Sequence, residues 1–205
     1  MLVHRFADFT TFGVAMSAKQ ASDHGVFFQT ADWFALLAQH GLPAGTALQW
    51  LMVTNDGAPV LCLPLIQEPD KLTSLSNFYT PLYAPLLLHD GLTTSDAPMD
   101  ALTAPALMAI ARFLRHKKPC PAVIQLQPLD TTGTFYPAMR SALTAAGYAV
   151  DDYFCFGNWT LPCTRLAFAD YFAQRPSALQ NTVHRARKKL DRAGTWKIDI
   201  HTQSG

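Results

Sequence analysis

Charged residues are scarce in this sequence of 205 residues. Asp, Glu, Lys and Arg make up 15% of the chain, against about 25% in an average soluble domain, and Glu68 is the only glutamate. Hydrophobic residues reach 49%, so the composition predicts a globular protein with a sizeable buried core and argues against a disordered chain. The length predicts one domain, or one domain and part of a second.

Cysteines and catalytic signature motifs are also few. The cysteines form no CxxC pair and no Cys/His cluster at metal-ligand spacing, so we expect no metal site and no redox dithiol. The sequence contains no P-loop, no dinucleotide fingerprint and no Ser/His/Asp arrangement, which argues against the enzymes that these motifs mark. We expect buried free thiols. The four residues are Cys62, Cys120, Cys155 and Cys163.

Long apolar runs are absent as well. The N-terminal stretch MLVHRFADFTTFGVAMSAK has scattered polar residues where a signal peptide has an unbroken apolar segment. No stretch reaches the ~20 apolar residues of a membrane span. These absences predict a cytoplasmic protein without a membrane span.

The order of the expected elements favours an α+β (mixed α/β) fold with a sheet covered by helices. Apolar periodicity, Gly and Pro predict the order β-α-β-β-β-α-β-α-β, with a tight hairpin turn at Asn55-Asp56-Gly57. Pro81 and Pro85 interrupt an extended segment. The elements are strands at 26–29, 48–54, 59–67, 122–128 (buried) and 148–162 (aromatic), an extended run at 72–88, and helices at 31–41, 100–117 and 134–147.

Positive charge is concentrated between residues 175 and 197. This segment carries seven of the 16 Lys and Arg residues and a single acid, Asp191, for a formal charge of +6, whereas the rest of the chain carries −5. A solvated surface helix is one interpretation. Such a helix normally mixes both signs of charge, however, so the one-sided composition favours binding to an anionic partner.

Residues 177–194 are predicted to form a helix. Ser177 and Gln180 fit a capping box, and Gly194 fits a C-terminal stop. Helical spacing predicts an apolar face that docks and a cationic face that stays free. The apolar residues are Leu179, Val183, Ala186 and Leu190, and those opposite are Asn181, Arg185, Lys188 and Arg192. Alternating apolar residues at 195–203 predict a following strand.

Several segments resemble the FemAB-like and CelD-like tandem acyltransferases of the GNAT (N-acetyltransferase-like) superfamily. FAQRPSALQNTVHRARKKLDRAG followed by WKIDIHT is similar to the start of that family's second domain. FFQTADWFALL and SNFYTPLYAPLL are similar to its entry strand and helix and to the segment after its hairpin. The matching positions in the first phrase are Arg175, Pro176, Ser177, Leu179, Asn181, Thr182 and Arg185.

The resemblance implies a GNAT-like mixed, mainly antiparallel sheet flanked by helices. It implies an N-terminal extension at 1–24, a GNAT-like domain at 25–163, and the start of a second, truncated GNAT-like domain at 164–205. The chain departs from the family pattern at Gln180, where the family often has Arg. It also lacks the Q/R-x-x-G-x-G/A phosphate cradle for coenzyme A.

The implied activity is transfer of an acyl group from an acyl thioester such as acetyl-CoA to an amine. The amine belongs to a cell-envelope, polysaccharide or sugar-nucleotide precursor, and acyl-CoA is a co-substrate rather than a bound cofactor. The expected substrate-binding residues are Tyr79 and Tyr83 in an acceptor cleft, and Arg175, Asn181, Arg185, Arg187 and Lys188 at an anionic acceptor.

Two questions stay open at this point. Glu68 and His184 are the titratable candidates for a general base, and an exposed surface position is the simpler interpretation of both. A non-catalytic module whose basic helix binds nucleic acid or another polyanion is the alternative function. The absence of aromatic residues between 177 and 194 argues against single-stranded nucleic acid.

Overall fold

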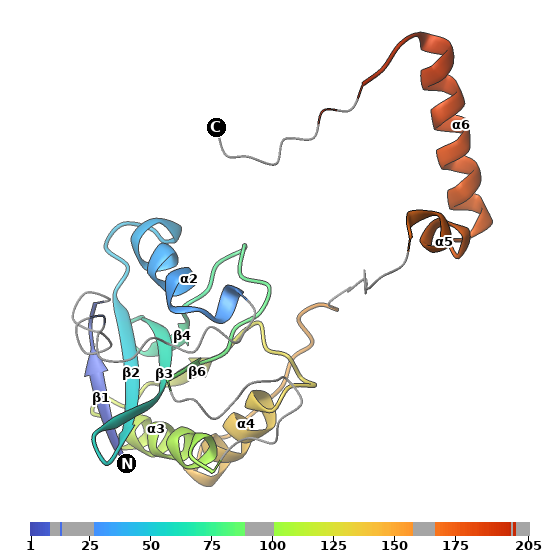
Figure 1. Cartoon of the computed structure of the whole chain (residues 1–205). Helices are drawn as coiled ribbons and strands as arrows, with labels where there is room; N and C mark the ends of the chain where they lie inside the picture. Colours follow the sequence, from blue (N-terminus) through green and yellow to red (C-terminus); the bar gives the residue numbers. More distant parts are fainter. Residues whose placement is uncertain (9–12, 14–26, 89–100, 158–166, 198, 200–205) are drawn as a thin grey trace. The chain divides into compact units, whose positions relative to one another are not determined.

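The computed structural model describes residues 1–8, 13, 27–88, 101–157, 167–197 and 199. The chain divides into two units, Met1–Cys155 and Phe156–Gly205 (Figure 1). The first unit contains the sheet and its covering helices, and the second contains two helices. The boundary predicted between residues 163 and 164 lies outside the described residues.

A mixed sheet forms the centre of the first unit. Every neighbouring pair of strands is antiparallel except β4 and β6, which run parallel. This sheet with flanking helices confirms the predicted α+β class. In the described residues its six strands are β1 (Leu2–Phe6), β2 (Leu48–Asn55), β3 (Ala58–Gln67), β4 (Lys71–Ser74), β5 (Leu86–Leu87) and β6 (Val123–Gln125), in the order β1-β2-β3-β4-β6 with β5 beside β3.

The predicted hairpin is confirmed in β2 and β3. Asp56 and Gly57 form its turn with φ angles of 50° and 81°, the left-handed values that a two-residue hairpin turn of this kind requires. Both strands are buried along most of their length. Their near-continuous apolar sequences therefore supply the core from both faces of the sheet.

One face of the sheet is covered by the segment that follows residue 26. The 3-10 turn η1 (Phe27–Gln29) leads into α2 (Ala31–Leu36), which continues as a π-helical turn, η2 (Leu37–Gly41). Thr30 begins α2, because its hydroxyl accepts the Trp33 N–H at 3.2 Å. Phe34 then packs edge-on against Trp50, with ring centroids 6.3 Å apart. The helix predicted at 31–41 is confirmed.

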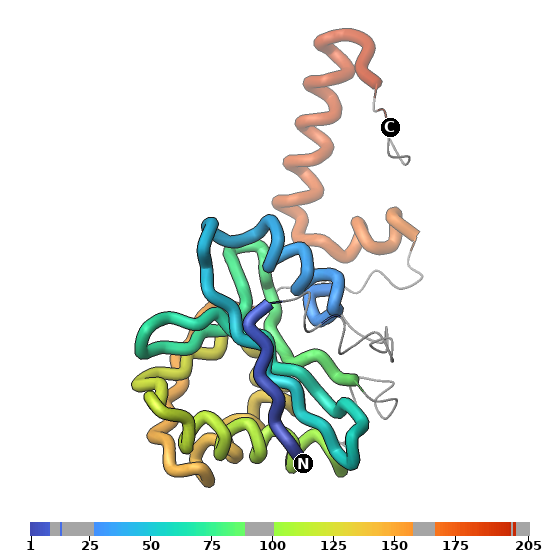
Figure 2. Tube along the Cα trace, turned by 90° about the vertical axis from the view of Figure 1, so that its left-hand side faces the viewer, coloured from blue at the N-terminus to red at the C-terminus, as the bar shows by residue number. Residues whose placement is uncertain are grey.

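Helices α3 (Thr103–His116) and α4 (Phe135–Ala145) cover the opposite face (Figures 1 and 2). Lys117, just after α3, bonds to Gln49, whereas the adjacent Trp50 contacts α2. Because neighbouring side chains of a strand point to opposite faces, α3 and α2 lie on different sides. The buried stripe of α3 includes Leu107, Ile110, Ala111 and Leu114, as its sequence period predicts.

Residues 2–6 were expected in an N-terminal extension, and that expectation is wrong for them. They form β1, which pairs antiparallel with β2 and lies at the edge of the sheet (Figure 2). His4 Nε2 and Thr54 Oγ1 lie 3.0 Å apart across this pair. The segment is short and its partner strand is distant in the sequence, so no local sequence pattern predicted a strand there. Residues 9–12 and 14–24 lie outside the described residues.

Three other strand predictions need correction. Residues 27–29 form a 3-10 turn rather than a strand, and residue 26 lies outside the described residues. Strand β6 was expected to be buried, but it ends the strand order and Val123 is 50% exposed. Residues 148–157 form no strand, and residues 158–162 lie outside the described residues.

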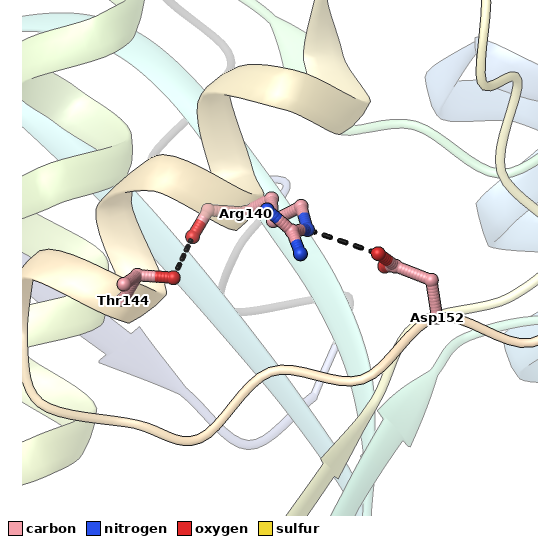
Figure 3. A network of polar contacts seen from close by, with 3 residues as sticks. All are labelled: Arg140, Thr144 and Asp152. Carbon is pink, nitrogen blue, oxygen red and sulfur yellow. Dashed lines mark hydrogen bonds and ion pairs between the residues drawn. The ribbon is translucent and has the colours of Figure 1, made fainter.

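The extended segment after α4 is held by packing of Tyr148 and Val150 against the core and by an ion pair, instead of by sheet pairing. Arg140 Nε donates to Asp152 Oδ2 at 2.9 Å, and within α4 the Thr144 hydroxyl donates to the Arg140 carbonyl at 2.9 Å (Figure 3). This ion pair ties the segment back to α4. Beyond it, the aromatic side chains of Tyr153 and Phe154 are exposed.

The second unit consists of α5 (Phe168–Ala173) and α6 (Ser177–Ala193) in its described part. The predicted basic helix is confirmed, and Gly194 ends it with a φ of 127°. Its apolar stripe was expected to dock, but Leu179, Val183 and Leu190 are all exposed. Residues 195–197 and 199 are not in a strand, and residues 198 and 200–203 lie outside the described residues.

The predicted capping box at the start of α6 is wrong. Pro176 occupies the N-cap position and Ser177 lies inside the helix, so the serine hydroxyl does not cap it. Gln180 Nε2 instead donates to the Arg175 carbonyl at 2.7 Å and to the Ala173 carbonyl at 3.3 Å. The glutamine thus satisfies backbone carbonyls at and just after the end of α5. These hydrogen bonds link α5 to α6 across the turn between them.

Candidate functional site

The backbone pairing of the parallel strands β4 and β6 is short. Their last backbone pair is Thr73 with Gln125. The Ser74 hydroxyl then donates to the Gln127 carbonyl at 2.6 Å and accepts the Gln127 N–H at 2.8 Å. A side chain thus replaces direct strand pairing at this point and keeps the two segments in contact. This point lies at the carboxyl ends of both strands, where open α/β sheets commonly bind ligands.

A tight turn follows directly after β4. The Asn77 amide oxygen accepts the Tyr79 N–H at 2.9 Å, and the Thr80 hydroxyl accepts the Asn77 N–H at 3.1 Å. Asn77 Nδ2 donates to the Gly41 carbonyl at 3.2 Å, which fixes the turn to the end of η2. A Cβ on Gly41 would lie 2.7 Å from Leu37 Cδ2 and 3.2 Å from Asn77 Nδ2, so a larger residue there would displace the end of the Leu37 side chain and crowd the Asn77 amide.

The turn sends its aromatic residues to different environments. Phe78 and Tyr79 are 96% and 72% exposed and contact each other edge-on at 5.6 Å. Tyr83 is 1% exposed, and its hydroxyl donates to the Pro64 carbonyl at 2.5 Å. Burial, and secondarily the neighbouring Cys62, raises the pKa of Tyr83 well above its ordinary value. Tyr79 is accessible to a ligand, whereas Tyr83 belongs to the core.

In the second unit, Arg175 stabilises the turn between α5 and α6. Its guanidinium lies 4.4 Å from the centroid of the Tyr171 ring, and its carbonyl accepts from Gln180. Its Nε atom is buried without an acceptor among the described residues. Arg175, which was predicted to bind substrate, is therefore engaged mainly in contacts within its own turn.

Three of the predicted cationic-helix residues share one face of α6. At 100° of rotation per residue, Asn181, Arg185 and Lys188 fall within about 60° of one another, whereas Arg187 points at least about 100° away from them. Arg185 Nε donates to the Asn181 carbonyl at 3.3 Å. All four are exposed. Arg192 is also exposed and lies between Asn181 and Arg185 at this rotation, so we name Asn181, Arg185, Lys188 and Arg192 the α6 cationic face.

The acid nearest to this face is engaged elsewhere. Asp191 Oδ1 accepts the Trp196 indole N–H at 3.0 Å. In the described part of the second unit, no carboxylate forms an ion pair with Arg185 or Lys188; the ion pair there joins Lys197 to Asp199. The positive charge of the α6 cationic face is therefore not neutralised by the described residues.

Sequence reasoning missed a polar cluster beneath the end of α3. Lys117 Nζ lies 3.0 Å from Gln49 Oε1 and 3.0 Å from Gln67 Oε1. Gln49 is fully buried, and its Nε2 has no acceptor among the described residues. Burial, and secondarily the charge of Arg5, lowers the pKa of Lys117. The sequence feature that could have indicated this cluster is Gln49, a single glutamine inside the apolar stretch LQWLMVT.

The other residues considered in the sequence have simpler surroundings. The His184 ring contacts Phe172 edge-on at 5.8 Å on an exposed helix. The expectation of four buried thiols is wrong, because only Cys62 is buried, Cys120 and Cys155 are exposed, and Cys163 lies outside the described residues. Within the described ranges, no group of three or more His, Cys, Asp or Glu residues could hold a metal ion.

Comparison of the chain with protein-family models, curated proteins and solved structures finds no match. Among the helices that the structure describes, none is both long enough and apolar enough to cross a membrane. The case for a function therefore depends on the contacts and charges given above and on the resemblance of the sequence motifs.

Proposed function

We propose that this chain acts in N-acyl transfer of the FemAB-like and CelD-like GNAT type. The observation that carries the proposal is the exposed Tyr79, which lies in the turn after β4, close to the carboxyl-end limit of the β4–β6 pairing. The carboxyl ends of strands in open α/β sheets commonly receive ligands. The segment also contains the SNFYTPLYAPLL phrase on which the resemblance depends.

The proposed reaction moves an acyl group from a thioester such as acetyl-CoA to an amine. The amine nitrogen attacks the thioester carbonyl, a C–N bond forms, and the C–S bond breaks. The proton lost by the amine balances the thiolate that leaves, giving free coenzyme A and an amide. Such a step needs a group that accepts this proton and donors that stabilise the developing oxyanion.

The acceptor in this proposal is an amine on an anionic cell-envelope, polysaccharide or sugar-nucleotide precursor. In the second unit, the α6 cationic face offers three cations and an amide that bind phosphate or carboxylate oxygens. In the first unit, the exposed hydroxyl and ring of Tyr79 are a separate candidate contact for a ligand. Tyr83 has no direct role, because its hydroxyl is buried and bonded to Pro64.

A second candidate function is binding of a polyanion, including nucleic acid, without catalysis. The distribution of charge on α6 favours it, because Arg187 and Lys189 extend positive charge beyond the α6 cationic face. Binding through several phosphates weakens steeply with salt, by roughly 0.9 in log K per unit of log salt for each phosphate contacted on duplex DNA. The salt dependence of binding therefore separates the two functions.

Calorimetric titration tests the proposal directly. The 205-residue chain is titrated with acetyl-CoA, then with UDP-glucosamine as an anionic amine acceptor, and finally with duplex DNA at two salt concentrations. We expect saturable binding of the amino sugar, and weaker binding of acetyl-CoA because the chain lacks the family's phosphate cradle for coenzyme A. We expect Arg185→Gln with Lys188→Gln to weaken amino-sugar binding about tenfold, in line with the loss of charge-assisted hydrogen bonds.

Arg187→Gln is the matched control for the single variants Arg185→Gln and Lys188→Gln, because each removes one positive charge and Arg187 lies on a different side of α6. Equal losses of amino-sugar affinity in the control and in the two single variants would contradict a role for the α6 cationic face. Absence of binding to both acetyl-CoA and the amino sugar would overturn the acyltransferase proposal. Steeply salt-dependent DNA binding in the same preparation would then favour the polyanion function.

A further inference from the structure

An open groove of about 680 Å³ lies in the first unit between the edge strand β1 and one side of α3. Val3, Met108 and Phe113 form part of its apolar wall. One end of the groove lies at the carboxyl end of α3 and is lined by Arg112, His116 and Lys117. The volume is in the range of small-molecule sites, which are typically ~300–1000 Å³.

The charged end of the groove is positive, because none of the described residues that line the groove is acidic. Arg5 lies close enough to lower the pKa of Lys117 further than burial alone does. Like charges brought together without a counterion raise the free energy of the folded protein. An anion bound at this end would remove that cost.

Behind this end lies the buried amide described above. Lys117 Nζ bonds to the side-chain oxygens of Gln49 and Gln67 at 3.0 Å each, which holds the ammonium group in place. Gln49 Nε2 is buried next to it with no acceptor among the described residues. A buried donor without an acceptor costs free energy. Gln49 does not line the groove, so its amide lies behind Lys117 and contributes by holding the ammonium group at the cationic end.

We propose that this groove binds a single-chain amphiphilic anion, namely a fatty-acid carboxylate. Its alkyl chain lies along Val3, Met108 and Phe113. Its carboxylate meets Arg112, His116 and Lys117, where charge-assisted hydrogen bonds form. The inference is independent of acyl transfer, because the groove lies in the first unit on the α3 face and uses none of the residues proposed for the acceptor.

The test uses dodecanoate below its micellar concentration. Its binding is followed by calorimetry and by NMR of the ¹³C-labelled methionine methyl groups, with Met108 assigned from Met108→Leu. We expect dodecanoate to shift the Met108 methyl signal and to leave that of Met52, which is buried on the opposite face of β2, in place. We expect acetate, which has no chain, and dodecyltrimethylammonium, which has the opposite charge, to bind at least tenfold more weakly.

Charge-removal variants test whether the cationic residues of the groove bind the carboxylate head group. We expect Arg112→Gln combined with Lys117→Gln to weaken dodecanoate binding at least tenfold, and exposed Arg112→Gln alone to weaken it severalfold without loss of folding. Lys118→Gln is the matched control, because Lys118 is the next residue along and does not line the groove. Equal binding of the cationic surfactant, or equal losses in Lys118→Gln and in the double variant, would overturn the proposal.

Discussion

Replacing Tyr83 with phenylalanine removes one buried hydroxyl and keeps the aromatic ring. The hydroxyl donates to the Pro64 carbonyl at 2.5 Å, and the same carbonyl also accepts the Leu75 N–H at 3.1 Å. The acceptor therefore keeps a partner in the variant. We expect the free energy of unfolding to fall by about 1 kcal/mol, the net value of one hydrogen bond, rather than by the ~3 kcal/mol of an acceptor left alone.

Tyr83→Ala removes the ring as well. That ring packs edge-on against Phe34, with centroids 6.1 Å apart, and is almost completely inaccessible to solvent. We expect the cavity and the lost packing together to cost about 3–5 kcal/mol, the range for removal of a buried aromatic side chain. The two variants therefore separate the contribution of the hydroxyl from that of the ring.

Urea unfolding followed by circular dichroism measures both changes. A shift of the midpoint at constant slope reports a change in stability. Exposed Tyr79→Ala is the control, and we expect its stability within about 0.5 kcal/mol of the parent while amino-sugar binding falls. A Tyr83→Phe protein with unchanged stability and weakened amino-sugar binding would refute the assignment of Tyr83 to the core.

Three further predictions concern titration, the hairpin turn and the second unit. Burial raises the pKa of Cys62 and Tyr83 above their ordinary values of 9.0 and 10.0. The unfolded chain therefore loses these protons at lower pH than the native chain does, and we expect the free energy of unfolding to fall as pH rises above 9. Urea midpoints measured across this range should show a flatter slope in Cys62→Ala, and an unchanged slope would contradict the assignment. Gly57→Ala should lower the free energy of unfolding by about 1 kcal/mol, because Gly57 has a φ of 81° in the turn, and an unchanged urea midpoint would argue against that turn geometry. Gln180→Ala should reduce the helical circular dichroism signal by releasing the carbonyls that join α5 to α6, whereas exposed Lys189→Ala, its control, should leave the signal unchanged.

Local patterns were sufficient to predict much of the first unit. The helices and the β2–β3 hairpin follow from apolar period and from turn residues that lie within a few positions of one another. β1 was missed because its five residues carry no turn or capping signal and its partner is far along the chain. Residues 148–157 have strand-forming aromatic residues, yet they pair with no strand of the described sheet, so propensity alone gave the wrong element.

In the candidate site too, contacts between residues close in sequence could be predicted, and contacts between residues far apart in sequence could not. The α6 cationic face could be predicted, because a helical period fixes which of its residues are neighbours. Tyr79 and Tyr83 lie in an irregular segment without a period, so their opposite burial could not be read from the sequence. Gln49 and Lys117 are 68 positions apart, and only the packing of α3 on the sheet brings them together.

The pairing of β1 with β2 also bears on how this protein is made. His4 and Thr54 meet across 50 positions of sequence, whereas the β2–β3 hairpin closes through a tight turn. A hairpin forms in about 1–10 μs, and a chain leaves the ribosome at about 5–20 residues per second. β1 therefore emerges roughly 2–10 s before the residues that pair with it. During synthesis its backbone N–H and C=O groups have no strand partner for that time, and we expect β1 to join the sheet only after the hairpin has formed.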